Sequence, residues 1–271
     1  MLMNELNLVN KEFISLLDEL AVQVDKVFDK KDFLQECIKD MDSHRNPLKR
    51  AKANKEHPFK VAPHYFELPP TRSQYKDKQG WYDPVGRDYL TYMQDLMRID
   101  PRSHVAGGFP NKETFVPAVE FYNRPEILKE IGVPNLRDLV YDISARYLGG
   151  GSMALCAFYP PDSYIPWHHN GNAPGYNILL HYNKQGKGAF YTLDNDEIIE
   201  YPDKQGWVCR AGQFLDTHGH EQRAQFTTTE KAGPENASWH AAHAVTNRFT
   251  LSTITNDKFV WEDLIDEIEG N

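Results

Sequence analysis

Two histidine clusters, far apart in the chain, have the residue types best suited to chemistry. The first is Ile165–Asn170 (IPWHHN) and the second is Ser238–His243 (SWHAAH). Neutral imidazoles bind transition metals, and one kind of iron site holds its metal by two histidines and one carboxylate, with open positions for substrate and oxygen. The two clusters therefore predict a metal site, with Asn170 at the position where a carboxylate is expected.

Strand geometry selects among the residues of the first cluster. Side chains alternate along a β-strand, so positions i and i+2 leave from the same face. His168 and Asn170 have this spacing, whereas His169 points to the opposite face. Trp167 and Trp239 each precede a candidate ligand, and we expect them to wall the pocket and keep it dry.

The composition is that of a globular chain with a core of ordinary size. The chain has 271 residues, of which 40% are hydrophobic and 12% aromatic, so it fits one large domain or one domain with an extension. The formal net charge is −9, which argues against general nucleic-acid binding. One stretch, Arg45–Lys60, is basic; we interpret it as a solvated linker or helix face, with contact to phosphate as the alternative.

Cysteine usage and hydropathy indicate the cellular setting. Cys37, Cys156 and Cys209 have no paired spacing, which favours a reducing compartment over a disulfide framework. No signal peptide is visible at the N-terminus, and no apolar run reaches the roughly 20 residues that span a bilayer. We therefore expect a cytoplasmic protein without a membrane segment.

The first half of the chain reads as helical and extended. Apolar residues recur at helical spacing from about residue 10 to 42 and again near 87–99, 125–130 and 135–147. Four prolines between residues 47 and 80 predict an extended segment. Three glycines at 149–151 end the last of these helices.

The second half of the chain reads as short strands. Runs at 153–159, 177–182, 188–193, 197–201, 206–210, 212–215 and 249–255 are β-like, and Asp194–Asp196 is a hairpin turn between two of them. Residues 259–268 form an amphipathic C-terminal helix. Strands at this spacing predict a sandwich or barrel. The fold class is therefore α+β, with a helical N-terminal region (1–148) packed on a β core with a C-terminal helix (149–271).

Several short motifs resemble a known family. Tyr159–Asn170 is similar to the tyrosine strand, turn and His-x-Asp motif of the 2-oxoglutarate/Fe(II)-dependent dioxygenases, especially the prolyl-hydroxylase-like group. Tyr201–Phe214 resembles that family's Pro-x-x-Gly turn and the strand after it. Trp239-His240, with Arg248-Phe-Thr250, resembles the distal histidine and the Arg-x-Ser/Thr pair.

The resemblance implies a fold, an activity and a set of ligands. The core would be a double-stranded β-helix, or jelly roll, that uses Fe(II), O₂ and 2-oxoglutarate to hydroxylate or otherwise oxidise an unidentified substrate. His168, Asn170 and His240 would hold the metal, while Arg248 and Thr250 would hold the far carboxylate of 2-oxoglutarate, because a guanidinium pairs with a carboxylate through two hydrogen bonds.

The choice of distal histidine also follows from the resemblance. In the family, the chain must finish one strand, turn and start the next between that histidine and the arginine. His240 lies eight residues before Arg248 and fits this gap better than His243, which lies five before it. His243 stays as the alternative.

The asparagine at the third ligand position leaves three interpretations open. Asn170 coordinates through its amide oxygen; or the position is open and is completed by water, an anion or a carboxylate such as Asp194 or Asp216; or the chain no longer binds iron.

Two rival functions come from other classes of protein. His218-Gly-His220 is a second His-x-His pair, and with a histidine of the first cluster it could form a cupin-type metal site. The jelly roll could also be a non-catalytic binding or structural module whose histidines are only structural.

Overall fold

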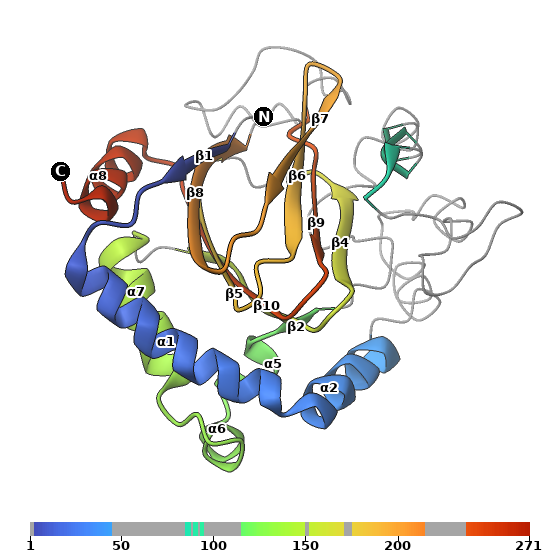
Figure 1. Cartoon of the computed structure of the whole chain (residues 1–271), viewed down its shortest axis with the longest axis vertical. Coiled ribbons are helices and arrows are strands. Elements are labelled where there is room, and N and C mark those ends of the chain that lie inside the picture. Colours follow the sequence, from blue (N-terminus) through green and yellow to red (C-terminus); the bar gives the residue numbers. More distant parts are fainter. Residues whose placement is uncertain are drawn as a thin grey trace, which may run out of the picture.

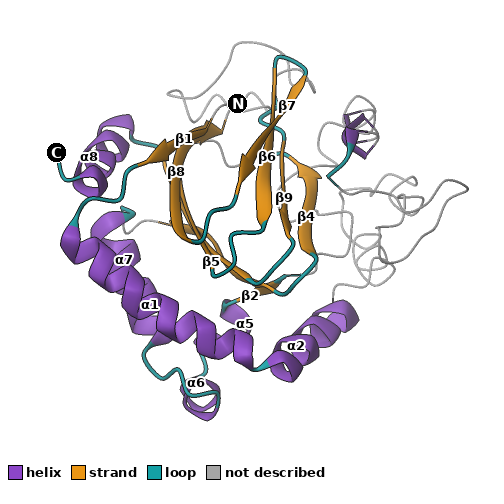
Figure 2. Ribbon diagram, in the orientation of Figure 1, coloured by secondary structure: helices purple, strands orange, loops and turns teal. Residues whose placement is uncertain are grey.

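The core of the protein is a pair of antiparallel β-sheets, with helices gathered outside the larger sheet (Figures 1 and 2). The structure is a computed structural model. It describes residues 3–44, 85–87, 89–91, 93–94, 115–149, 152–170, 175–214 and 237–271. Side chains from both sheets meet between them: Met3 and Leu179 of the larger sheet pack with Phe190 and Ala242 of the smaller one. The prediction of a mixed chain with a β-rich second half is confirmed.

The larger sheet has six strands in the order β1-β8-β5-β10-β3-β2. Its strands are β1 (Met3–Leu6), β2 (Val116–Pro117), β3 (Ser152–Tyr159), β5 (Gly175–Asn183), β8 (Gly206–Phe214) and β10 (Arg248–Thr255). The two runs predicted at 206–210 and 212–215 are one continuous strand, β8, which pairs with β5 along its whole length.

The smaller sheet has four strands in the order β4-β9-β6-β7. Its strands are β4 (Ser163–His168), β6 (Gly188–Asp194), β7 (Glu197–Pro202) and β9 (His240–Ala244). The predicted hairpin turn between β6 and β7 is present, and Asn195 and Asp196 take positive φ values of 46° and 65° there. Asparagine and aspartate tolerate this backbone region better than most residues do.

From β3 onward, the chain passes repeatedly from one sheet to the other. The strands β3, β5, β8 and β10 belong to the larger sheet, and β4, β6, β7 and β9 belong to the smaller one. Inward positions of both sheets therefore face a shared interior. Residues far apart in sequence can meet there.

Helices cover the outer face of the larger sheet. They are α1 (Lys11–Asp29), α2 (Lys31–His44), α5 (Val119–Tyr122), α6 (Pro125–Glu130), α7 (Leu136–Tyr147) and α8 (Lys258–Glu269). The side chain of Asn10 caps α1 by accepting from the backbone N–H groups of Glu12 and Phe13. One apolar cluster joins these helices to the outward residues of the sheet, such as Phe158 and Phe249.

The N-terminal residues form an edge strand that the helical periodicity did not predict. Strand β1 pairs antiparallel with β8, and the Met3 backbone N–H donates to the Tyr201 hydroxyl of β7 at 2.9 Å. The N-terminal strand thereby links the edges of the two sheets. Residues before 149 also supply β2 to the same sheet, and the division of the chain at residue 148 stays a prediction.

Among the helices that the structure describes, none has the length and apolar character needed to cross a bilayer.

Truncation of a buried ring should show how much the interface between helices and sheet contributes to stability. Phe158 is fully buried and contacts the rings of Phe28, Phe121 and Phe249. We expect Phe158→Ala to lower the free energy of unfolding by about 3 to 5 kcal/mol in a urea titration. Phe259→Ala is the matched control, since Phe259 is 76% exposed, and we expect it to change stability by no more than about 0.5 kcal/mol. Equal losses would contradict the packing described.

Candidate metal centre and the buried cations beside it

The pairing of three strands brings the two histidine clusters together. Strand β9 lies between β4 and β6, so His240 sits directly opposite His168 on one side and Thr192 on the other. The imidazole rings of His168 and His240 have their centroids 4.0 Å apart. Both histidines are buried. Two imidazoles at this separation are close enough to bind one metal ion.

An irregularity in β4 decides which residue faces His240. Ile165 pairs with Ala242, but the next pair is His168 with His240, so three steps on β4 match two steps on β9. This extra residue is a β-bulge, and bulges turn a side chain to the other face of a sheet. In regular pairing, Trp167 would stand opposite His240. The bulge falls at Pro166, which has no backbone N–H to donate to the partner strand.

Each histidine of the pair is held by the same local hydrogen bond. His168 Nδ1 lies 2.8 Å from the Pro166 carbonyl oxygen, and His240 Nδ1 lies 2.7 Å from that of Ser238. A carbonyl can only accept, so Nδ1 carries the proton in both rings and donates it. Nε2 then carries the lone pair of each ring. Histidines that bind metals are commonly oriented in this way, with the second ring nitrogen donating to a carbonyl.

Burial keeps both imidazoles neutral. It lowers the pKa of His168 well below its usual value, and the neighbouring His240 lowers it further. The pKa of His240 falls to about 4, again because of burial. Only the neutral ring can act as a ligand, so the two side chains are in the form that metal binding requires.

Asn170 lies at the edge of this pair. Its amide Nδ2 is 3.3 Å from His240 Nε2, so the amide faces the lone pair that a metal would share. A rotation of the amide would bring Oδ1 to the same place, because the two ends of an asparagine amide are nearly alike in shape. Among the described residues, no group of three or more His, Cys, Asp and Glu side chains is placed to hold a metal ion. A third protein ligand from this part of the chain would therefore be Asn170.

The remaining histidines of the two clusters lie elsewhere. His243 is three residues beyond His240 and pairs with Tyr164 and Ala189, so its side chain leaves from the opposite face of β9. His169 is fully buried, and its ring packs edge-on against Trp239 at 4.9 Å.

The expectation that two tryptophans wall the site is wrong. Trp167 and Trp239 pack with Ala241, Tyr191 and Leu193 on the outer face of the smaller sheet. Helical residues 89, 90 and 93 cover them there. The bulge explains the error for Trp167, because it turns the tryptophan outward while His168 turns inward. Phe214 and Phe190 are the aromatic residues that lie near His240, with ring centroids 4.7 and 5.8 Å from it.

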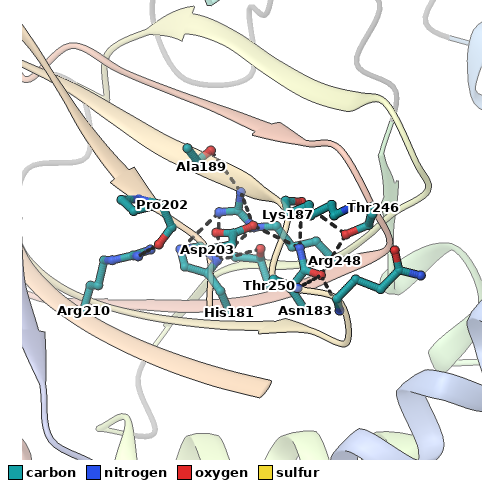
Figure 3. A network of polar contacts seen from close by, with 12 residues as sticks. His181, Asn183, Lys187, Ala189, Pro202, Asp203, Arg210, Thr246, Arg248 and Thr250 are labelled. Atoms are coloured by element: carbon teal, nitrogen blue, oxygen red, sulfur yellow. Dashed lines mark hydrogen bonds and ion pairs between the residues drawn. The ribbon is translucent and has the colours of Figure 1, made fainter. Parts of the chain in front are cut away.

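The predicted anion-binding residues are buried on the facing sheet. Arg248 and Thr250 are on β10, and Thr250 pairs with His181 of β5. His181 Nδ1 lies 3.0 Å from Thr250 Oγ1 and accepts from Arg248 Nε at 3.3 Å (Figure 3). Burial lowers the pKa of His181 well below its usual value, and the charges of Arg248 and Arg210 add to this effect.

Sequence reasoning missed the carboxylate that accompanies Arg248. Asp203 follows β7, and its Oδ2 lies 3.6 Å from Arg248 Nη1, with both side chains 1% exposed. The same oxygen accepts from Asn183 Nδ2 at 3.2 Å (Figure 3). In the sequence, Asp203 stands in the polar turn Asp-Lys-Gln-Gly, which is typical of an exposed loop. Only the three-dimensional fold identifies it as a buried partner.

Other residues named from the sequence lie away from the pair or outside the described part of the chain. Asp194 is the last residue of β6, beside the hairpin turn, where its carboxylate accepts from Asn195 at 3.2 Å. Asp216, His218, His220 and the basic stretch Arg45–Lys60 fall outside the described residues.

Comparison with known proteins leaves the family open. No family model matches the chain, and no curated protein matches it. Among solved structures, the chain is similar to a predicted oxalate decarboxylase from Thermotoga maritima, with a TM-score of 0.21, 19% identity, and coverage of 39% of this chain and 68% of that one. It is also similar to a full-length Neurospora crassa protein in complex with alpha-KG and 5-formyluracil, with a TM-score of 0.21, 10% identity, and coverage of 83% and 82%. At these TM-scores the chemistry has to be argued from the residues.

Three buried neutral histidines should make the metal-free protein sensitive to acid. Above about pH 6.5 the imidazole rings are neutral in both the folded and the unfolded protein. Below that pH the unfolded chain binds protons that the folded protein does not, so the free energy of unfolding decreases as the pH falls. The loss continues down to the folded pKa, which for His240 is about 4. We expect each of His168, His181 and His240 to contribute about 1.4 kcal/mol per pH unit, and His181→Gln to reduce the slope by about a third. Denaturant titrations between pH 7 and 5 measure how the free energy of unfolding depends on pH. A free energy of unfolding that does not change over this range would show that the rings are not buried as neutral groups.

Proposed function

We propose that the chain is a 2-oxoglutarate/Fe(II)-dependent oxygenase built on a double-stranded β-helix. The alternation of the strands from β3 to β10 between two antiparallel sheets supports the jelly-roll fold. The observation that carries the function is the inward-facing pair of His168 and His240, with both Nδ1 atoms engaged by backbone carbonyls. Such a pair has both Nε2 atoms unprotonated, on rings whose centroids are 4.0 Å apart.

The donor set fits Fe(II) in kind and in protonation state. Imidazole nitrogen suits iron, and the usual third donor is an oxygen. His168 and His240 would supply the nitrogens, and Asn170 would supply its amide oxygen after the amide rotates. The 3.3 Å contact between Asn170 and His240 favours this interpretation of the third position over a distant carboxylate. Asp194 is engaged at the hairpin turn.

The buried cations fit an anionic co-substrate. Arg248 and Thr250 would hold the far carboxylate of 2-oxoglutarate, as their spacing on β10 implies. A guanidinium buried to 1% exposure binds a carboxylate more strongly than an exposed one, since little water competes. When bound, Fe(II) and 2-oxoglutarate would supply the activation of O₂ that oxidises the substrate. The chain itself would orient these groups and keep water away through Phe190 and Phe214.

Two alternatives remain, and each makes a different prediction about the metal. A non-catalytic jelly-roll protein needs no metal. A cupin-type site would depend on His218 and His220, which lie outside the described residues, and would not depend on Arg248. The hydrogen-bonded orientation of His168 and His240 favours the oxygenase, because a purely structural pair has no need for two adjacent buried rings that both keep Nε2 unprotonated.

An anaerobic titration tests the proposal directly. Fe(II) added with 2-oxoglutarate should produce a visible metal-to-ligand charge-transfer band in the wild-type protein. We expect His168→Ala and His240→Ala to abolish the band, since each removes one of two nitrogen donors. His243→Ala is the matched control and should retain it, because His243 leaves from the other face of β9. Absence of the band in the wild type, or its loss only in His243→Ala, would overturn the assignment.

Replacing the third ligand tests the role of the asparagine. A carboxylate at position 170 would offset part of the metal charge, which a neutral amide does not. We expect Asn170→Asp to tighten Fe(II) binding by about tenfold or more, measured by competition with a chelator. Asn170→Ala should weaken it by a similar factor. Equal affinities in all three proteins would show that residue 170 does not touch the metal.

A further inference from the structure

A second arginine, Arg210 on β8, is buried next to the residues around Arg248. It is 1% exposed, and it pairs across the sheet with Leu179 of β5. Its guanidinium reaches toward the smaller sheet, where it lies 5.8 Å from the centre of the Tyr201 ring and donates to the Pro202 carbonyl at 2.6 Å (Figure 3). Arg210 therefore points into the interior between the sheets.

Most of the hydrogen-bonding capacity of Arg210 is unused. Within the part of the chain that the structure describes, the buried Nε and Nη1 atoms have no hydrogen-bond partner. A buried donor without a partner costs the free energy of its lost hydration, and the cost is greater for a charged group. Burial accordingly lowers the pKa of Arg210. An arginine in this state is ready to bind a group that supplies acceptor oxygens.

The buried charges around Arg210 do not balance. Arg210 and Arg248 are both buried, and Asp203 is the buried carboxylate near them, closest to Arg248 at 3.6 Å. Glu5 stands opposite Arg210 on β1, but its side chain is exposed and pairs with Lys204. His181, the other titratable group of the cluster, is held neutral, as its lowered pKa indicates. Among the described residues, the two buried cations and one buried anion leave one positive charge, and the exposed Glu5–Lys204 pair adds no net charge to it. The cluster is therefore suited to receive one further negative charge.

Arg210 lies on the same inward face of β8 as Phe214, which contacts His240. On β8, the inward positions run from Arg210 through Gly212 to Phe214, whose ring lies 4.7 Å from His240. Gly212 has no side chain; Met3, opposite it on β1, packs at this level with Leu179 and Phe190. The distance along the strand from Arg210 to Phe214 is roughly 13 Å. An arginine side chain and an elongated dicarboxylate could span it together.

We propose that Arg210 is the second cationic anchor of the site, and that it binds, together with Arg248, one carboxylate of a dicarboxylate ligand. Arg210 would donate hydrogen bonds to this carboxylate from its unpaired Nε and Nη1 atoms. Because Asp203 offsets one of the two arginine charges, the site would bind one carboxylate rather than two. The inference rests on the proposed function in taking 2-oxoglutarate as the natural ligand. It adds that Arg210 selects for a carboxylate at the end of the ligand remote from the histidines, so a 2-oxo acid without that carboxylate binds poorly.

Ligand binding to the metal-free protein tests the proposal without any enzyme activity. The probes are 2-oxoglutarate, glutarate and pyruvate, and the readouts are calorimetric affinity and the shift in Tm. We expect both dicarboxylates to bind and to raise Tm, and pyruvate to do neither. Arg210→Met should weaken binding of both dicarboxylates by about 10- to 100-fold, the loss expected for a charge-assisted pair. Arg124→Met, at an exposed arginine, is the matched control and should bind as the wild type does.

The same variants distinguish a binding role from a structural one. Removal of an uncompensated buried charge should leave the ligand-free Tm of Arg210→Met and Arg210→Gln unchanged or higher. If Arg210 instead pairs with Asp203 through a bridging water, both variants would lose stability without ligand, and that result would overturn the proposal. So would failure of both to fold, wild-type affinity in Arg210→Met, or no dicarboxylate binding to the wild type.

The outcomes also separate this inference from the proposed function. If glutarate binding depends on Arg210 but the wild type shows no Fe(II) charge-transfer band, the oxygenase proposal is refuted and the binding role of Arg210 is retained. If the band in Arg210→Met reaches half its amplitude at the same 2-oxoglutarate concentration as in the wild type, the oxygenase assignment holds and the role of Arg210 is refuted.

Discussion

The register between β4 and β9, with its bulge at Pro166, is the constraint on which the site depends. A strand that slips by one residue exchanges its two faces. The bulge produces such an exchange within β4 alone. Trp167 packs on the outer face of the smaller sheet against the helical residues near position 90, while His168 faces His240. The carbonyl of Pro166 then accepts from His168 Nδ1. One irregularity thus sets which residue faces inward and which ring nitrogen carries the lone pair.

The second organising feature is the charge buried between the sheets. Burying an ion is costly, and a partner of opposite charge offsets only part of that cost. Arg248 has such a partner in Asp203, whereas Arg210 contacts a carbonyl and the face of a tyrosine ring and feels the carboxylates of Asp203 and Glu5 only at longer range. Strand β1 covers the edge of β8 beside Arg210, and the bond from Met3 to Tyr201 links the two sheets there. The N-terminus thereby helps to exclude water from the cations.

The sequence was informative where local rules decide the structure. The Asn195-Asp196 turn was read from its residue types. Strand alternation alone does not account for the inward position of His168, because the bulge between Ile165 and His168 reverses the alternation there. The sequence did not reveal features that depend on residues distant in the chain. The short strand β1 carries too few residues for a periodic signal, and Asp203 stands in a turn whose composition is that of a surface loop. Arg210 was likewise read only as part of a strand, because its burial and its unused donors are visible only once Tyr201 and Pro202 are in place.

The central claim is that His168 and His240 bind one metal ion through their Nε2 atoms. X-ray absorption spectroscopy of the anaerobic Fe(II)-loaded protein measures this most directly, because scattering from the imidazole rings reports how many histidines are bound. The account predicts two imidazoles in the wild type and one in His240→Ala. A wild-type spectrum without imidazole scattering, or two imidazoles retained in His240→Ala, would contradict it.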